Sequence, residues 1–311
     1  MRTHPIIEMA ELEAFERAAR EGSFTRAADE LGLTQPSISA RIASLEKTLG
    51  CEMFERGGRH LKMTTAGKVF LPYARRILAT MQDGMEAVDR CVSGRMGSLS
   101  MVAMNAQALY ILPEPMARFR QMYPAVDLSI RLRAPDEIRD MLLDGEAVLG
   151  LTGAPMWAKG LIVHATFHEA VRPTVSTHHA LAQRQQEQGG RLSVTDLYDH
   201  IIYRITLSPN VTALVENIAE AARQGSGGAV IQIPATMGIS LLIQGQGVAF
   251  LPENAVRRHI NDGRLVFLNI TDIPPLVDEV LLVSLKGRAL DVPAKEFVRI
   301  LRDVWRDMLV D

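Results

Sequence analysis

Three helical segments, each followed by a glycine, lie near the N-terminus and constrain the fold of this chain more than any other feature. Leu12, Phe15 and Ala19 recur at i, i+3 and i+7, which is typical of one apolar stripe along a helix. Glycine readily takes the backbone conformation that ends a helix or makes a tight turn, and it stands at Gly22, Gly32 and Gly50. Two helices joined by a short glycine-containing turn form a helix-turn-helix arrangement.

The third of these segments shows two different faces. Ile38, Ile42, Leu45 and Leu49 form its apolar face, and Thr34 is placed to cap its first turn. The opposite face carries small side chains with few charges, flanked by Ser39 and Arg41: Pro36, Ser37, Ala40, Ala43, Ser44 and Lys47. Such a face can enter the major groove of DNA closely. The alternative is a solvated face of an ordinary helical hairpin.

A short two-stranded wing is predicted next. Residues 53–55 and 61–64 have strand character, and Gly57-Gly58 lies between them as a turn. Cationic side chains surround that turn, at Arg56, Arg59, His60 and Lys62. Residues 33–62 hold five Lys and Arg against three Asp and Glu, a local net charge of +2, which suits contact with phosphates.

A long helix is predicted from Ala66 to about residue 92. Its apolar positions are spaced 4, 3, 4 and 7 residues apart, at Phe70, Ala74, Ile77, Met81 and Val88. This heptad-like seam predicts that two copies of the helix pair in a dimer. The alternative is a helix packed on its own domain. Pro72 is expected to kink the helix near Lys68, because proline removes a backbone hydrogen bond.

Residues 93–98 are rich in Gly and Ser and predict a linker, after which strands and helices alternate. Strands are expected at 98–104, 126–132 and 147–152, and helices at 109–122 and 136–144. The pattern recurs with strands near 200–206, 229–233, 247–251, 265–270 and 279–285, and with helices near 211–223, 236–244, 253–261 and 294–308. Such alternation predicts a mostly parallel α/β sheet.

Composition limits the function classes. The formal net charge is −2, so a DNA-binding surface must be a local patch. Cys51 and Cys91 are the only cysteines, which excludes a disulfide framework and argues against thiol-based peroxide sensing in the C-terminal region. No apolar run approaches the roughly 18 residues of a membrane span, so a cytoplasmic protein that does not bind membranes is expected. No metal-ligand or cofactor motif is complete, so neither a metal nor a cofactor is expected, and no catalytic residues are assigned.

Residues 9–67 resemble the winged helix-turn-helix domain of the LysR-type transcriptional regulators. The residues that carry this resemblance are Ser23-Phe24, Ala27-Ala28, Leu31, Thr34-Gln35-Pro36-Ser37, Ser39, Ile42, Leu45-Glu46, Leu49-Gly50, Phe54, Arg56 and Thr64-Thr65-Ala66-Gly67. The resemblance implies a sequence-specific DNA-binding protein. It places Thr34, Gln35, Pro36, Ser37, Ser39, Ala40 and Arg41 at the bases and Arg56 and Arg59 at phosphates. Many relatives have Arg where this chain has Ala40, which puts a bidentate Arg–guanine contact there in doubt.

The C-terminal region resembles the effector domain of the same family. The matching positions are Phe119-Arg120, Tyr123-Pro124, Leu142, Gly145-Glu146, His179-Ala180-Leu181-Ala182, Gly245, Gly247 and Leu251-Pro252, whereas Val148 departs from the usual Asp. The implied fold class is α+β multidomain: an N-terminal winged helix-turn-helix, a long linker helix, and a two-lobed α/β effector domain resembling periplasmic binding proteins.

The expected domains are 1–65 for DNA binding, 66–92 for the dimerisation helix and 93–311 for effector binding, with lobe I at 97–165 and 270–311 and lobe II at 166–265. Ligands in such folds bind at the carboxyl ends of strands, where helix N-termini favour anions. A small, anionic organic effector is therefore expected at Asn105, Gln107, Arg133, Pro135, Thr152, Arg204 and Thr206.

The resemblance also implies the partners: promoter DNA with an interrupted palindrome, a homodimer or homotetramer, and RNA polymerase as a further contact. Effector binding is expected to close the lobes and to change the angle between paired DNA-binding domains. Two alternatives remain open on the residues alone. One is a solute-binding protein of a transporter, which shares the two-lobed fold. The other is an α/β enzyme with a helical appendage.

Overall fold

The computed structural model describes residues 6–55, 61–93, 97–154, 160–187, 189–224 and 229–310. The chain divides into two compact units, and each is described by itself. The first comprises Met1–Gly94 with Leu143–Glu146 and Leu285–Ala289. The second comprises Arg95–Leu142, Ala147–Ser284 and Leu290–Asp311. No helix among the described residues is long and apolar enough to span a membrane.

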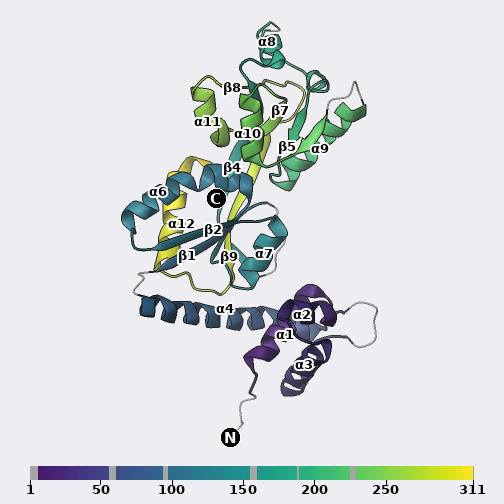
Figure 1. Cartoon of the computed structure of the whole chain (residues 1–311), viewed down its shortest axis with the longest axis vertical. Helices are drawn as coiled ribbons and strands as arrows, with labels where there is room; N and C mark the ends of the chain where they lie inside the picture. The colour runs from purple at the N-terminus through teal and green to yellow at the C-terminus, as the bar shows by residue number, and fades with distance from the viewer. Residues whose placement is uncertain are drawn as a thin grey trace. The chain divides into compact units, whose positions relative to one another are not determined.

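Four helices build the first unit (Figure 1): α1 (Met9–Glu21), α2 (Phe24–Leu31), α3 (Gln35–Leu49) and α4 (Thr65–Ser93). The three predicted glycines follow the first three helices, each in the left-handed conformation with φ of 58°, 63° and 72°. The core contains apolar side chains of all four helices, and the rings of Phe15 and Phe54 lie 5.6 Å apart within it. The predicted helix-turn-helix is therefore present.

The second unit holds one mixed sheet in the order β2-β1-β3-β9-β4-β7-β5-β6, to which β8 and β10 add by pairing with β4. Its strands are β1 (Ser98–Ala103), β2 (Asp127–Leu132), β3 (Leu149–Gly153), β4 (Leu161–Ser176), β5 (Ile202–Arg204), β6 (Val230–Gln232), β7 (Val248–Pro252), β8 (Leu265–Phe267), β9 (Leu276–Leu285) and β10 (Leu309–Val310). The pairs among β1–β3 and among β5–β7 are parallel, as predicted. The pairs β3–β9 and β4–β7 are antiparallel.

Two apolar cores divide this unit into lobes. We call β1–β3 with α5 (Asn105–Ile111), α6 (Pro113–Met122), α7 (Pro135–Leu143) and α12 (Val292–Val304) the first lobe. In it α6 and α12 pack on one face of the sheet and α7 on the other (Figure 1). The second lobe contains β5–β8 with α8 (Ala180–Glu187), α9 (Pro209–Gln224), α10 (Ala235–Ile243) and α11 (Glu253–Asn261). The long strands β4 and β9 contribute side chains to both cores.

One helix prediction was wrong in its bounds. The segment 109–122, expected as one helix, belongs to two helices, α5 and α6, which meet at Leu112. Pro113 stands in the first turn of α6. Proline has no N–H and its ring clashes with the preceding turn, so it is tolerated at a helix start but not within a helix. Because of this break α5 is a separate short helix, and Ala106 packs in the core of the second lobe while Tyr110 packs in that of the first.

Candidate functional site

The outer face of α3 is the first candidate site, and its exposure follows the predicted pattern. Ile38, Ile42 and Leu45 are buried. Thr34, Gln35, Pro36 and Ala40 are exposed, and Ser37, Ser39 and Arg41 are half-buried. The tight turn at Gly32 between α2 and α3 leaves the start of α3 on the surface, where short polar side chains can approach another molecule.

Two side-chain hydrogen bonds organise the first turns of α3. The Gln35 Nε2 donates to Ser39 Oγ at 2.9 Å, one helical turn later. The hydroxyl oxygens of Thr34 and Ser37 lie 2.9 Å apart. Thr34 occupies the predicted N-cap position, but its side chain makes no capping bond to a backbone N–H. That part of the prediction was wrong, because the hydroxyl pairs with Ser37 instead. Gln35, Ser37 and Ser39 thus hold donors and acceptors of the kind that read base edges.

A short antiparallel bridge joins Phe54 and Met63 next to α3, where the wing was predicted. The Glu55 N–H donates to the Lys62 carbonyl at 2.8 Å, and the Thr64 N–H to the Met53 carbonyl at 2.9 Å. Glu46 of α3 accepts from the Met53 N–H at 2.7 Å, which fixes the bridge to the helix. The predicted phosphate ligands Arg56 and Arg59 lie outside the described residues.

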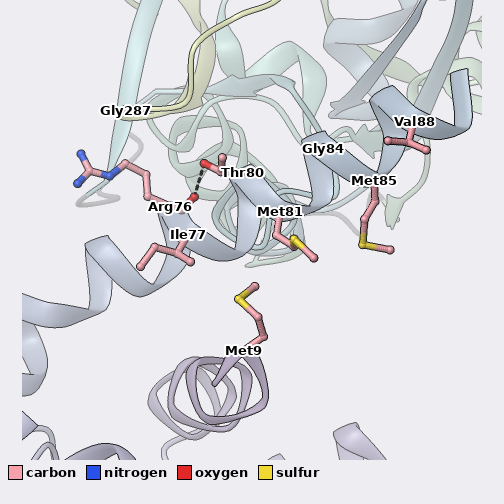
Figure 2. A pocket seen from close by; sticks show the side chains of 9 residues that line it. All are labelled: Met9, Arg76, Ile77, Thr80, Met81, Gly84, Met85, Val88 and Gly287. Carbon is pink, nitrogen blue, oxygen red and sulfur yellow. Dashed lines mark hydrogen bonds between the residues drawn. The ribbon is translucent and has the colours of Figure 1, made fainter. Parts of the chain in front are cut away.

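Helix α4 carries an exposed apolar stripe over its length. Val69, Tyr73, Ile77, Met81, Met85 and Val88 are each at least 45% exposed, which is unusual for so many large apolar side chains on one helix. Figure 2 shows Ile77, Met81, Met85 and Val88 along an apolar groove, with Met9 of α1 opposite Met81. Side chains of this kind on one helix face suit a second helix better than water.

Two residues of the predicted seam belong elsewhere. Ala74 is fully buried and Phe70 is half-buried, and both pack in the core of the first unit. The Phe70 ring lies 5.7 Å from that of Phe15. The seam prediction was wrong for these two positions, because the first turns of α4 complete the core of the first unit. The exposed stripe passes through Tyr73 and Val69 instead.

A cleft in the second unit is the other candidate site. It consists of two cavities that share Met104, Pro135 and Thr206. Its walls are the last residues of β3 and the segments that follow the carboxyl ends of β1, β2, β5 and β6. This is where ligands bind in open α/β sheets. The start of α7 also lines it, as does the start of α10 at Pro234 and Ala235.

Five of the seven predicted effector residues line this cleft: Asn105, Arg133, Pro135, Thr152 and Thr206. Two do not. Gln107 is fully buried behind the wall, and its Nε2 donates to Asp278 at 2.9 Å. Arg204 bonds Gln232 at 2.8 Å and pairs with Glu216 at 3.4 Å. Arg139 of α7 and Glu216 of α9 also line the cavity that contains Thr152. The prediction missed them, because it considered only residues that follow strands and these two lie on helices.

The charges around the cleft are already paired. Arg133 lies 3.8 Å from Glu137, and Arg139 lies 3.0 Å from Asp136 and from Asp140. Hydrogen bonding to Asp140 is the main cause that raises the pKa of Arg139, so this side chain stays cationic. The Ala134 N–H already donates to Glu137 at 3.0 Å, and Pro135 and Pro234 have no N–H. The donors that the cleft offers to a carboxylate are therefore the two arginines, each beside acidic side chains, and the N–H groups of Asp136 and Ala235 in the first turns of α7 and α10.

Two family models match this chain, one over each of its two regions. A family model described as the LysR substrate binding domain matches residues 93–306, and one described as a bacterial regulatory helix-turn-helix protein of the lysR family matches residues 9–68. The HTH-type transcriptional regulator CbbR of Rhodospirillum rubrum is 26% identical to this chain and covers 97% of it and 98% of its own length.

Solved structures show the same fold over the whole length. A full-length OxyR variant from Pseudomonas aeruginosa is 19% identical, covers 99% of both chains and has a TM-score of 0.60. Full-length CbnR, solved in complex with its target DNA, is 21% identical, covers 95% of this chain and 99% of its own, and has a TM-score of 0.51. At this identity the two structures establish the architecture alone.

Proposed function

Because this chain belongs to the LysR family of bacterial transcriptional regulators, we propose that it recognises a specific promoter sequence and that a small anionic effector controls it. The family assignment makes it a DNA-binding transcriptional regulator with an effector-binding domain, and not an enzyme. The finer statements on DNA sequence, assembly and effector are the proposal. Its main support is the exposed start of α3, where Gln35 and Ser39 present polar groups on a helix of small side chains.

In this proposal α3 lies in the major groove. The residues that face the bases are Thr34, Gln35, Pro36, Ser37, Ser39, Ala40 and Arg41. Arg56 and Arg59 contact the phosphates of the DNA. Hydrogen bonds to base edges carry sequence information, whereas contacts to phosphates fix position. Ala40 cannot itself make a bidentate contact with guanine, so discrimination rests on its neighbours, chiefly Gln35 and Ser39. An interaction of this kind contributes about 1–3 kcal/mol per base pair.

Two copies pair through the exposed stripe of α4, which places two recognition helices on the half-sites of an interrupted palindrome. Two such dimers form a tetramer, and RNA polymerase is a further partner at the promoter. The stripe supports pairing because its six large apolar residues would otherwise face water. A two-fold operator mirrors the two-fold symmetry of the dimer.

The effector occupies the cleft and is an organic anion. Its carboxylate accepts from the N–H groups at the starts of α7 and α10 and from Arg133, after this arginine leaves Glu137. Asn105, Pro135, Thr152 and Thr206 complete the walls. Binding favours the closed arrangement of the lobes and changes the angle between paired DNA-binding domains, which requires different affinities for the two states.

A footprint on the DNA upstream of the gene tests the first part. We expect protection of two half-sites whose centres lie one or more helical turns apart on one face of the duplex. Protection that does not depend on sequence, or the same protection by the Gln35→Ala, Ser39→Ala variant, contradicts the proposal. The Thr195→Ala variant, which removes an exposed hydroxyl of the second lobe, is the matched control and should protect as the wild type does.

Calorimetry with a panel of organic acids tests the second part. We expect at least one acid to bind, and Arg133→Gln and Thr206→Val to weaken it at least tenfold. Arg118→Gln, on the far helix α6 of the first lobe, is the control and should leave the affinity unchanged. Isotherms that the Arg133 and Thr206 substitutions leave unchanged would place the effector elsewhere.

A further inference from the structure

A buried carboxylate lies directly behind the cleft. Asp278 of β9 is fully buried and accepts three hydrogen bonds. Gln107 Nε2 donates to its Oδ2 at 2.9 Å and the Tyr110 hydroxyl to the same oxygen at 3.2 Å. The Ser208 N–H donates to Oδ1 at 2.7 Å. The two carboxylate oxygens thus hold two different segments, since Gln107 and Tyr110 belong to α5 and Ser208 precedes α9.

Both segments are walls of the cleft. The start of α5 contributes Met104, Asn105 and Ala106 to the lining. The neighbours of Ser208 on either side, Leu207 and Pro209, line the cavity that Thr152 also lines. Asp278 itself lines neither cavity, so its bonds set the position of the walls without touching a ligand.

The wall at Ser208 is packed closely against the first lobe. A Cβ added to Gly153 at the end of β3 would lie 2.9 Å from Ser208 Cα, a distance that real Cβ atoms do not show. Gly153 therefore allows the two lobes to approach closely at Ser208. The N–H of the same residue, Ser208, donates to Asp278 on the side away from the cleft.

The environment of Asp278 makes these bonds expensive to lose. Burial raises the pKa of Asp278, and the bonds from Ser208, Gln107 and Tyr110 oppose that rise. Burial, followed by the charge of Asp278, raises the pKa of Tyr110 well above its usual value, so this hydroxyl stays a donor. The three hydrogen-bond donors to Asp278 are uncharged. Each of these buried donors would lose its acceptor if the carboxylate were removed.

We propose that Asp278 is a positioning residue that holds α5 and the segment 207–209 together and thereby fixes the separation of the two lobes across the cleft. This goes beyond the proposed function, because it concerns the geometry of the ligand-free protein. The separation of the lobes can be measured with no effector present. A failure to find an effector therefore does not contradict the role of Asp278, and a failure of the Asp278 test does not contradict effector binding.

The conservative variant Asp278→Asn separates bridging from charge. Gln107 Oε1 has no hydrogen-bond partner in its buried position. If the Gln107 amide rotates by a half-turn, this oxygen accepts from the Nδ2 of the introduced asparagine, while the asparagine oxygen keeps the Ser208 N–H. Asp278→Asn therefore retains a bond to each wall, whereas Asp278→Ala retains none.

Double electron–electron resonance on the full-length protein, which measures the distance between two spin labels, tests the proposal. Spin labels at Gln121→Cys in α6 and Asn217→Cys in α9 report the separation of the lobes, with Cys51 and Cys91 replaced by Ser. The labelled protein is assembled with an excess of unlabelled protein, so that distances to labels on a second copy do not contribute. Both labelled positions are exposed. We expect one narrow distance distribution for the parent. Asp278→Ala should broaden it and shift it to longer distances, and Asp278→Asn should restore it.

Asp272→Ala is the matched control, because Asp272 accepts from Ser193 Oγ and the Val194 N–H within the second lobe. Its distribution should equal that of the parent. A narrow, unshifted distribution for Asp278→Ala overturns the proposal, as does an equally broad one for Asp278→Asn. If Asp278→Ala does not fold, Gln107→Leu combined with Tyr110→Phe removes the bonds to α5 alone. That variant should broaden the distribution, and an unchanged one overturns the proposal.

Discussion

Gln35 donates a hydrogen bond to Ser39 across the first turn of α3, with 2.9 Å between Nε2 and Oγ. The two side chains that are proposed to discriminate bases are therefore bonded to each other in the chain without DNA. Binding to a base edge must exchange this bond or extend it, since a hydroxyl can both donate and accept. The two residues are expected to act as one unit in recognition.

A double-mutant cycle on operator DNA measures this coupling. Gln35→Ala and Ser39→Ala should each weaken binding by about 1–3 kcal/mol. The double variant should fall short of the sum by about 0.5 kcal/mol or more, because residues in one hydrogen-bond network are not additive. Fluorescence anisotropy at fixed salt gives the four affinities. Strict additivity would show that the Gln35–Ser39 bond plays no part in the complex.

The exposed stripe of α4 predicts the effect of a charge at its centre. Met81→Asp should shift the protein to a smaller assembly in sedimentation velocity, because a carboxylate in a helix–helix seam lacks a partner. Met81→Leu keeps the volume and apolar character and should keep the assembly of the wild type. If the Met81→Asp variant sediments as the wild type does, this stripe is excluded from the interface.

A buried ion pair fixes α4 to α1. The Arg75 Nε and Nη2 atoms donate to Glu16 Oε1 at 3.1 and 3.0 Å, and both side chains are largely buried. Glu16→Ala should lower the free energy of local opening of α1 by about 3 kcal/mol, because it leaves a buried charge unpaired. Hydrogen exchange of the α1 amides measures this. Glu30→Ala breaks the exposed pair with Arg17 and should cost less than about 1 kcal/mol. Equal losses in the two variants would contradict the difference in burial.

The His179 and His200 rings, 4.8 Å apart, predict a loss of stability in mild acid. Burial lowers the pKa of both, and the His200 charge lowers that of His179 further; the nearby Asp199 opposes the shift of His200 and Arg184 adds to it. The folded-state pKa of each histidine lies below the unfolded value of 6.5. The folding stability that the two neutral rings contribute is therefore present above pH 6.5 and is lost as the pH falls below it.

Calorimetric melting of the full chain between about pH 7.5 and pH 5 checks this. His179 Nδ1 accepts from the Leu181 N–H at 3.2 Å, and protonation removes that acceptor. His179→Gln should reduce the fall in melting temperature with pH. His168→Gln, at an exposed position of β4, should leave the fall as in the wild type. An identical fall in the His179 variant would assign the effect to other groups.

Local patterns predicted the helix-turn-helix well. The burial of Ile38, Ile42 and Leu45 and the exposure of the opposite face of α3 follow from helical periodicity, which is a property of neighbouring residues. The glycine after each helix follows from backbone sterics. The strand ends that line the cleft were also predictable, because parallel strands bring their carboxyl ends to one edge.

Contacts between distant residues were not predictable in this way. The periodicity of α4 does not distinguish Phe70 and Ala74, which pack on the core, from Tyr73 and Met81, which remain exposed. Asp278 lies 171 positions from Gln107 along the chain, so no local pattern joins them. For the same reason Gln107 was placed in the cleft by its position after β1, although its side chain turns to β9.

Affinity for the DNA upstream of the gene tests sequence-specific binding, the central claim, most directly. Full-length protein is titrated against that duplex and against the same duplex with its half-sites scrambled, over a range of salt concentrations. The account predicts that the intact sequence binds about a thousandfold more tightly or better at physiological salt, as is usual for specific binding. Affinities that are equal for the two duplexes, with the same dependence on salt, would contradict it.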